Sequence, residues 1–258
     1  MSRGVMIFAH DQEQLELAQE CSRRVHKYLG LEVCLVTNLR IFHHSDPRFE
    51  YVRSYELVTA YSKHFGYEMS PFDETLILDP TYMIMNPKTP LNLLFAEGSS
   101  EFKIGMKVQD LMGNVIDDYI HPNSIKNVSS AVIYFKRSPL AEKIFLLSGA
   151  VSENWNFFSK QFRVKERTND ALFAIAFHLV MGQVNPTFRE VYRIPFPILM
   201  LRDVERDKIK ALDEDQAYIV YDAVDCKRAI VLHQTDFLSS EPENLLNMLR
   251  QYNQRETA

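Results

Sequence analysis

Apolar runs and a helical repeat alternate along the first part of the chain. Residues 4–10 and residues 31–38 are short apolar runs that are typical of buried strands. Between them, apolar residues recur at close to helical spacing, Asp11 can cap the start of a helix, and Gly30 can end it. A strand, a helix and a second strand in this order predict a βαβ unit, with parallel strands and a right-handed crossover.

The same patterns continue to the end of the chain without a repeat, a linker or a low-complexity tract. Residues 39–54 lack a period and predict a surface loop, whereas residues 55–69 predict a helix. Further strands are expected at 70–79, 102–114, 129–138, 192–201, 217–222 and 228–235, and helices at 87–95, 139–162 and 169–182. Strands that alternate with helices predict a single α/β domain with a mostly parallel central sheet flanked by helices.

Composition and charge narrow the class of protein. Hydrophobic residues make up 46% of the chain and charged residues 24%, which is ordinary for a globular protein. The formal net charge of −5 gives no overall basic field, so a nucleic-acid partner would need a local basic patch. No apolar stretch approaches the roughly 20 residues of a membrane span, and the N-terminal apolar run is too short for a signal peptide. Three cysteines in regular segments, Cys21, Cys34 and Cys226, favour buried free thiols. We therefore expect a cytoplasmic protein without a membrane partner.

Candidate chemistry lies where the predicted strands end, because ligands of open α/β sheets bind outside the carboxyl ends of parallel strands. In this chain those ends carry Ala9 and His10, Thr37 and Asn38, and Asp79 to Thr81. Asp79 precedes a proline, and a carboxylate two positions later would complete an Asp-x-Asp clamp for a divalent cation. Thr81 stands at that position.

The segment YEMSPFDETLILDPTYMIMN, residues 67–86, resembles the central segment of nucleotide-sugar glycosyltransferases of the GT-A fold, where L-Y-x-L-S-P-F-D-x-T-L-x-L-D-x-D is a common form. Three later stretches agree in order and rough spacing. NVSSAVIYFKRSPLAEKIF resembles the family's N-S-G-v-x-x-F strand and the helix after it, RTNDALFAIAF resembles a helix start, and RAIVLHQT resembles the late strand that carries a histidine. The resemblance covers roughly residues 4–237.

The resemblance implies one GT-A-like, Rossmann-type domain over residues 1–258. Its nucleotide-binding half would lie near residues 1–90, its acceptor-side half near 91–240, and a C-terminal helix or tail at 241–258. It also implies an enzyme that transfers a sugar from a nucleotide-sugar donor to an acceptor hydroxyl. A uridine or guanosine donor is expected, with a UDP-sugar favoured and its base near Thr37 and Asn38.

The resemblance further implies a metal. In the family, the Asp-x-Asp carboxylates hold Mn²⁺ or Mg²⁺, which bridges the donor diphosphate, and a late histidine often completes the coordination. Asp79 matches the first carboxylate and His233 the histidine, so both are expected metal ligands. Thr81 departs from the pattern, and the loss of a carboxylate should weaken metal binding. Weak metal use through Asp79 and His233 is favoured over a cation-free site, in which basic side chains would neutralise the diphosphate: Lys136, Arg137, Lys165 and Arg167.

Each expected site residue has a second interpretation. The donor is expected to contact Ala9, Thr37, Asn38, Asp79 and Thr81, and Asp170 matches the family's acid that faces the sugar or the acceptor, which makes it the expected catalytic residue. An aspartate before proline also fits a type I turn after a strand. Asp170 also fits a helix cap, and a lone histidine at a strand end such as His233 more often has a structural role.

Two other functions and one acceptor stay open. A degenerate protein that binds nucleotide sugars without turnover would explain Thr81, and an unrelated nucleotidyltransferase would also use a carboxylate at a strand end, although no glycine-rich phosphate loop follows the first strand. The acceptor could be a hydroxymethylated base of bacteriophage DNA, since compact glycosyltransferases of this kind occur in phages. That reading needs the basic residues to gather at one crevice mouth: Arg40, Arg48, Arg53, Lys103, Lys107, Lys126, Lys160, Arg163, Lys165 and Arg167.

Overall fold

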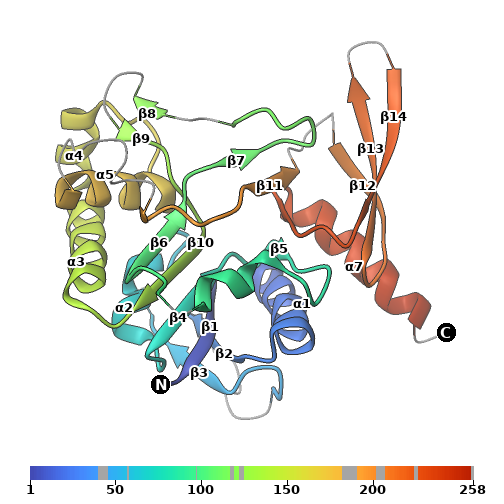
Figure 1. Ribbon diagram of the computed structural model, residues 1–258, viewed down its shortest axis with the longest axis horizontal. Helices are drawn as coiled ribbons and strands as arrows, with labels where there is room; N and C mark the ends of the chain where they lie inside the picture. Colours follow the sequence, from blue (N-terminus) through green and yellow to red (C-terminus); the bar gives the residue numbers. More distant parts are fainter. Residues whose placement is uncertain are drawn as a thin grey trace.

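A six-stranded sheet forms the centre of the protein in the order β3-β2-β1-β4-β10-β6 (Figure 1). The computed structural model describes residues 1–39, 46–56, 58–96, 98–116, 119–121, 125–181, 191–201, 207–223 and 226–256. Strands β1 to β4 run parallel, while β10 is antiparallel to both of its neighbours. The six strands span Arg3–Ala9 (β1), Glu32–Thr37 (β2), Tyr51–Ser54 (β3), Glu74–Leu78 (β4), Phe102–Gly105 (β6) and Ser129–Lys136 (β10). The expected α/β class with a mostly parallel sheet is confirmed.

The N-terminal βαβ unit is confirmed at its predicted bounds. Helix α1 (Gln12–Leu29) begins after Asp11, whose side chain accepts a hydrogen bond from the amide of Gln14, and ends at Gly30 in the left-handed conformation, with φ of 63°. Strand β4 pairs with β1 on the side away from β2, so the strand expected within residues 70–79 belongs to the same sheet. Neighbouring side chains of a strand point to opposite faces of the sheet. Apolar side chains therefore reach both faces, and both faces must be covered.

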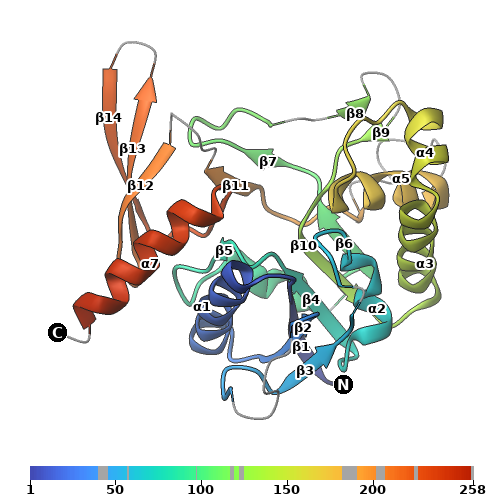
Figure 2. The same ribbon diagram turned by 180° about the vertical axis from the view of Figure 1, so that it is seen from behind.

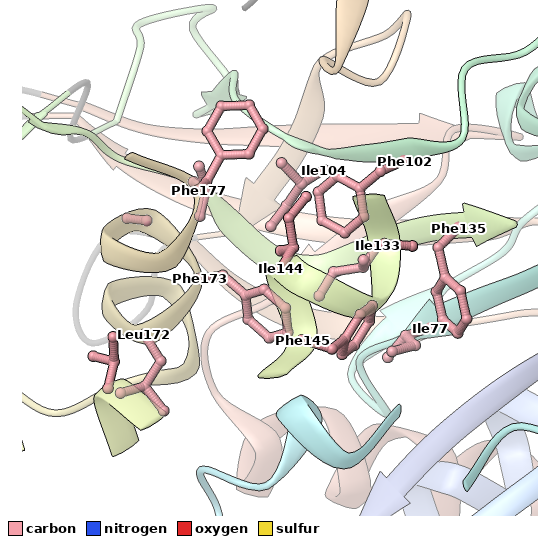
Figure 3. Close-up of a cluster of buried hydrophobic side chains, with 14 of the residues drawn as sticks. Ile77, Phe102, Ile104, Ile133, Phe135, Ile144, Phe145, Leu172, Phe173 and Phe177 are labelled. Atoms are coloured by element: carbon pink, nitrogen blue, oxygen red, sulfur yellow. The ribbon is translucent and has the colours of Figure 1, made fainter. Parts of the chain in front are cut away.

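Each face of the sheet is covered by helices. Val5, Ile7 and Ala9 of β1 pack with α1 on one face, whereas Met6 and Phe8 belong to the cluster on the other. That second cluster is rich in aromatic residues and lies under α3 (Pro139–Glu153) and α5 (Asn169–Met181). Figure 3 shows Phe145 and Phe173 of these helices against Ile133 of β10, and Figure 2 shows α1 on the other side of the sheet.

The C-terminal part adds two smaller sheets. Strands β5 (Tyr82–Met83), β15 (Phe237–Ser239), β11 (Ile198–Leu201) and β7 (Val108–Gln109) form one, and β12 (Asp207–Leu212), β13 (Gln216–Ala223) and β14 (Cys226–His233) form an antiparallel sheet that extends beyond the main body (Figure 1). Helix α7 (Pro242–Glu256) lies against this second sheet and shares a core with it through Leu245, Leu246 and Leu249. A two-stranded ribbon is formed by β8 (Tyr119–His121) and β9 (Ile125–Lys126).

Several sequence predictions of elements were wrong. The loop expected at 39–54 contains the edge strand β3, and the helix expected at 55–69 is reduced to a short 3-10 turn, η1 (Lys63–Phe65), and one turn of helix, α2 (Gly66–Met69). The helix expected at 139–162 ends at Glu153 and restarts as α4 (Trp155–Phe162), while the strand expected at 102–114 divides into β6 and β7. The short helix η2 (Pro90–Phe95) is confirmed within 87–95.

The structure also bears on the expectations for the cysteines and for a membrane span. Cys21 and Cys34 are buried free cysteines as expected, and burial raises the pKa of the Cys34 thiol to about 12. The side chain of Cys226 lies outside the described part of the chain. Among the helices that the structure describes, none combines the length and apolar character that a bilayer crossing requires.

Candidate functional site

The carboxyl ends of β1, β2 and β4 lie at one edge of the main sheet. Ala9 and Thr37 are register partners at this edge, and Ile7 pairs with Leu78 immediately before Asp79. The chain leaves β1 toward β2 on one side, and β4 lies on the other side, so the strand order reverses at β1. Ligands of open α/β sheets bind at such reversal points. Asp79 is therefore placed where the sequence predicted a ligand site.

A lysine that the sequence did not single out occupies this edge. The side chain of Lys63, at the start of η1, is only 6% exposed, and its Nζ donates to Asp79 Oδ2 at 2.8 Å. The same Nζ donates to the backbone carbonyl of Ser130 at 3.0 Å. The Asp79 side chain is 29% exposed, so solvent reaches the carboxylate but hardly the ammonium.

The second carboxylate oxygen of Asp79 is bound by Thr81. Asp79 Oδ1 accepts from the Thr81 amide at 3.1 Å and from the Thr81 hydroxyl at 2.8 Å, and the Tyr82 amide donates to the Asp79 carbonyl at 2.9 Å. Residues 79–82 thus form a turn after the strand. Burial alone would raise the pKa of Asp79, but the Lys63 ammonium and the hydrogen bonds from Lys63 and Thr81 lower this pKa below its ordinary value.

Asp170 reaches the same edge from the start of α5. One of its carboxylate oxygens accepts from the amide of Ser130 at 2.7 Å and from the Ser130 hydroxyl at 2.6 Å. Thr168 caps this helix, because its hydroxyl accepts from the amide of Ala171 at 3.1 Å. The helix cap that the sequence suggested at Asp170 is therefore formed two residues earlier, by Thr168. The Asp170 side chain instead binds Ser130 of β10.

The two aspartates differ in acidity. Burial raises the pKa of Asp170 above its ordinary value, and the nearby Asp79 charge adds to this; the hydrogen bonds from Ser130 and the Lys63 ammonium oppose the shift without cancelling it. Asp79 has a lowered pKa and Asp170 a raised one, although both lie near the same lysine. Opposed shifts in one site are typical of carboxylates with different roles. We call Lys63, Asp79, Thr81, Ser130 and Asp170 the strand-end cluster.

The expected base-binding residues lie beside this cluster. Ala9 and Thr37 are fully buried, and the Thr37 hydroxyl accepts from the amide of Leu39 at 3.1 Å. The Asn38 amide group donates to the carbonyl of Val58 at 2.8 Å. The other polar atom of this side chain, Oδ1, is buried and has no hydrogen-bond partner among the described residues. Asn38 therefore offers an acceptor atom whose hydrogen-bonding capacity these residues do not use.

His233 lies elsewhere in the fold. It is the last residue of β14, pairs with Gln216 across the antiparallel sheet, and is exposed. The late residue that lies against Thr81 is Ser239, whose amide donates to the Thr81 carbonyl at 3.3 Å. His233 ends a strand of the three-stranded sheet and Asp79 follows β4 of the main sheet, and among the described residues the two make no contact with each other.

The residues of the strand-end cluster do not fit a divalent cation. Three of the roughly four lone-pair directions of the Asp79 carboxylate already accept hydrogen bonds, one from the Lys63 ammonium and two from Thr81. A hard cation needs several oxygen ligands with free lone pairs. In the described part of the chain, no three histidine, cysteine, aspartate or glutamate side chains gather into a metal-binding group. The donor set favours a site in which an ammonium stands where the sequence predicted a metal.

The other basic candidates are distant from the cluster or tied to neighbours. Lys136 and Arg137 follow the opposite end of β10 from Ser130, and Lys136 lies 3.8 Å from Glu74. Arg167 donates to the hydroxyl of Ser152 at 2.6 Å, and its guanidinium lies over the ring of Tyr61. The basic side chain that contacts Asp79 is Lys63, which was not among the basic residues named from the sequence.

Comparisons with known proteins place these observations beside other chains. No protein-family model matches the sequence, and no curated protein matches it. Similar solved structures include the galactosyltransferase LgtC in complex with donor and acceptor sugar analogs, at a TM-score of 0.43 and 11% identity, covering 73% of this chain and 82% of that chain. The structure of mouse xyloside xylosyltransferase 1 has a TM-score of 0.43 and 9% sequence identity, and the match covers 71% of this chain and 84% of that chain.

A structure of another activity is equally similar. The inositol-1-phosphate CTP transferase from T. maritima has a TM-score of 0.43 and 12% identity, covering 74% of this chain and 95% of that chain. Since sugar and nucleotidyl transferases score alike at this level, these likenesses assign no activity to the chain. The functional argument rests on the strand-end cluster.

Proposed function

We propose that this protein binds a nucleoside diphosphate sugar at the strand-end edge and transfers the sugar to an acceptor hydroxyl. The observation that carries the proposal is the pair of aspartates with opposed pKa shifts, Asp79 and Asp170, held around one buried lysine at the reversal point of the sheet. The resemblance of residues 67–86 to the central segment of GT-A glycosyltransferases supports the choice of a sugar nucleotide among ligands of such an edge.

The donor's position follows from the geometry of the edge. The base would lie over the end of β2, where Asn38 Oδ1 has no hydrogen-bond partner among the described residues, and a uridine with its ring N–H suits this acceptor. The diphosphate would then extend along the edge toward Asp79 and Lys63. The sugar would lie beyond it, near Asp170 at the start of α5.

Asp170 has the properties of the base in this reaction. Its raised pKa makes it a stronger proton acceptor than Asp79. In a transfer with a single displacement, the acceptor oxygen bonds to the anomeric carbon as the carbon–oxygen bond to the diphosphate breaks. The proton of the acceptor hydroxyl passes to the Asp170 carboxylate, and the electron pair of the broken bond stays on the diphosphate. Asp79 keeps its charge because its pKa is lowered, and it holds Lys63 in place.

A second function is favoured by the same turn. Thr81 and Lys63 occupy both oxygens of Asp79, and a protein that binds sugar nucleotides without turnover would tolerate this arrangement equally well. In that case Asp170 would contact the ligand but would accept no proton. Release of nucleoside diphosphate from a bound donor separates the two functions.

The positions of the basic residues bear on the class of acceptor. Arg48 and Arg53 flank or belong to β3, whereas Lys160, Arg163, Lys165 and Arg167 belong to α4 or the segment after it. These two groups come from different edges of the molecule (Figure 1), so the arginines at β3 and the basic residues of α4 and the segment after it do not gather at one crevice mouth, and Arg40 lies outside the described residues. We therefore propose an acceptor alcohol without a phosphate backbone, and DNA binding in a gel-shift titration would contradict this choice.

The proposal is tested by titrating UDP and GDP into the protein and by assaying the release of UDP from UDP-sugars with simple alcohols present. Asp170→Asn should reduce turnover by about 100-fold or more, the typical contribution of a general base, while UDP binding changes little. Asp213→Asn, at an exposed position in the β12–β13 turn, is the matched control and should leave both unchanged. Wild-type protein that binds neither nucleotide would refute the proposal.

A further inference from the structure

Lys63 has a hydrogen-bonding capacity that its protein contacts do not exhaust. A lysine ammonium carries three protons. Within the described part of the chain, Nζ has two acceptors, Asp79 Oδ2 at 2.8 Å and the Ser130 carbonyl at 3.0 Å. One N–H of the ammonium therefore has no acceptor among the described residues, and the carboxylate of Asp79 beside it is partly exposed.

The backbone of Lys63 is also fixed. Its amide donates to Asn169 Oδ1 at 3.3 Å, and the side-chain amide of Asn169 donates to the carbonyl of Ala60 at 2.6 Å. The residue is thus tied to the start of α5 through its main chain and to β4 and β10 through its ammonium. A cation held in this way needs no rearrangement when a negative ligand arrives, which is the condition for effective electrostatic stabilisation.

The charge balance of the turn is the same as that of a metal clamp. An Asp-x-Asp pair with a divalent cation sums to zero formal charge. Asp79, the neutral hydroxyl of Thr81 and the Lys63 ammonium also sum to zero. The missing carboxylate at position 81 and the added ammonium at position 63 compensate each other, whereas Thr81 beside a divalent cation would leave one positive charge in excess. The substitution at Thr81 is therefore matched by a second feature of the same site.

We propose that Lys63 replaces the divalent cation of this site, so that its ammonium binds the diphosphate of the donor directly and no metal is required. This inference rests on the proposed function and adds the residue that receives the negative charge. As the bond to the sugar breaks, the electron pair moves onto the terminal phosphate oxygen, and the Lys63 ammonium donates its third hydrogen bond to that oxygen.

The test compares UDP with uridine, because only UDP carries the diphosphate. Calorimetric titration of the wild type should give the same affinity for UDP in EDTA and in Mn²⁺. Lys63→Met should lower the affinity for UDP by about 10- to 100-fold, as expected for the loss of a hydrogen bond between charged groups. The affinity for uridine should stay within about threefold of the wild-type value. Lys160→Met, an exposed lysine of α4, is the matched control and should bind both ligands like the wild type.

Two further variants separate ligand binding from folding. Lys63→Met leaves Asp79 without its cation, so the double variant Lys63→Met/Asp79→Asn removes both charges and keeps the turn neutral. It should fold, as judged by thermal unfolding, and should show the same selective loss of UDP affinity. The double variant Lys63→Met/Thr81→Asp restores two carboxylates, and its UDP binding should become dependent on Mn²⁺. A purely structural lysine would produce neither the selective loss nor the new metal dependence.

The outcomes distinguish this inference from the proposed function. Wild-type UDP binding that disappears in EDTA, or Lys63 variants that bind UDP like the wild type, would overturn the role of Lys63 and leave the donor assignment intact. A wild type that binds no nucleoside diphosphate with or without Mn²⁺ would overturn the proposed function and the role of Lys63 together.

Discussion

Two consecutive arginines of α1 provide a direct test of how the C-terminal sheet is attached to the main body. Arg24 is fully buried, and its guanidinium donates to Glu20, to the carbonyl of Ile84 and to the carbonyl of Glu214. Arg23 is 38% exposed and binds the side chains of Glu20 and Glu214. The two arginines share their acidic partner but differ in burial, so each is a control for the other.

Replacing Arg24 by methionine should lower the free energy of unfolding by about 3 kcal/mol. Breaking a buried ion pair costs about 3–5 kcal/mol, and the lower value applies because Arg23 still pairs Glu20 at 2.9 Å. The carbonyl of Ile84 loses a donor, and methionine recovers part of the packing. The unpartnered nitrogen of Arg24, Nη2, disappears with the substitution, which also limits the loss.

Arg23→Met should cost about 1 kcal/mol or less, because ion pairs with solvent access contribute little to stability. Urea unfolding of both variants, followed by circular dichroism, measures the difference. Equal destabilisation by the two substitutions would refute the argument that the buried carbonyl contacts of Arg24 attach the sheet. A loss for Arg23→Met that exceeds the loss for Arg24→Met would show that the side-chain ion pairs carry the attachment instead.

Two other predictions follow from the shifted pKa values. The pKa of Asp79 is lower in the folded protein than its unfolded value near 3.9, so its contribution to stability is complete above that pH and is lost as the pH falls through the folded pKa. Urea unfolding between neutral and acid pH should therefore show a steeper loss of stability for the wild type than for Asp79→Asn, and parallel curves would contradict the assignment. Cys21 and Cys34 should resist iodoacetamide in the native protein and react after unfolding, because burial raises the pKa of both thiols; peptide mapping that finds either one labelled in the native state would contradict their burial.

The part of the fold that the sequence predicts well is the part determined by neighbouring residues. Residues 4–38 alternate between apolar runs and a capped helical period, and the strands, helix and caps form where these signals lie. The break at Asn154 and the edge strand β3 follow from packing on other elements, which no local period reports. The region after β3 shows the limit most clearly, since its apolar residues suggested a helix and only one turn forms there.

The candidate site divides in the same way. The sequence singles out Asp79 because it follows a buried strand at the position of the resembled family's first carboxylate, and Asp170 because it matches that family's acid at a helix start. Lys63 carries no such signal, as it lies in a short turn and reaches Asp79 across a gap of 16 residues in sequence. His233 was placed by the motif of its strand, but the register of β14 with β13 is set by pairing over its whole length, and the strand against the Asp79 turn is β15. Strand register is set by pairing between residues that lie far apart in the sequence, and a short motif carries no information about it.

Ser130 links the two charged groups through a single residue. Its amide and hydroxyl bind Asp170, and its carbonyl binds Lys63. Because both groups bind the same residue of the sheet, the size of that residue limits the distance between the proposed proton acceptor and the proposed cation. Asp170 belongs to α5 and Lys63 to η1, so their common contact with Ser130 keeps the proposed point of proton transfer close to the proposed cation as long as both hydrogen bonds hold.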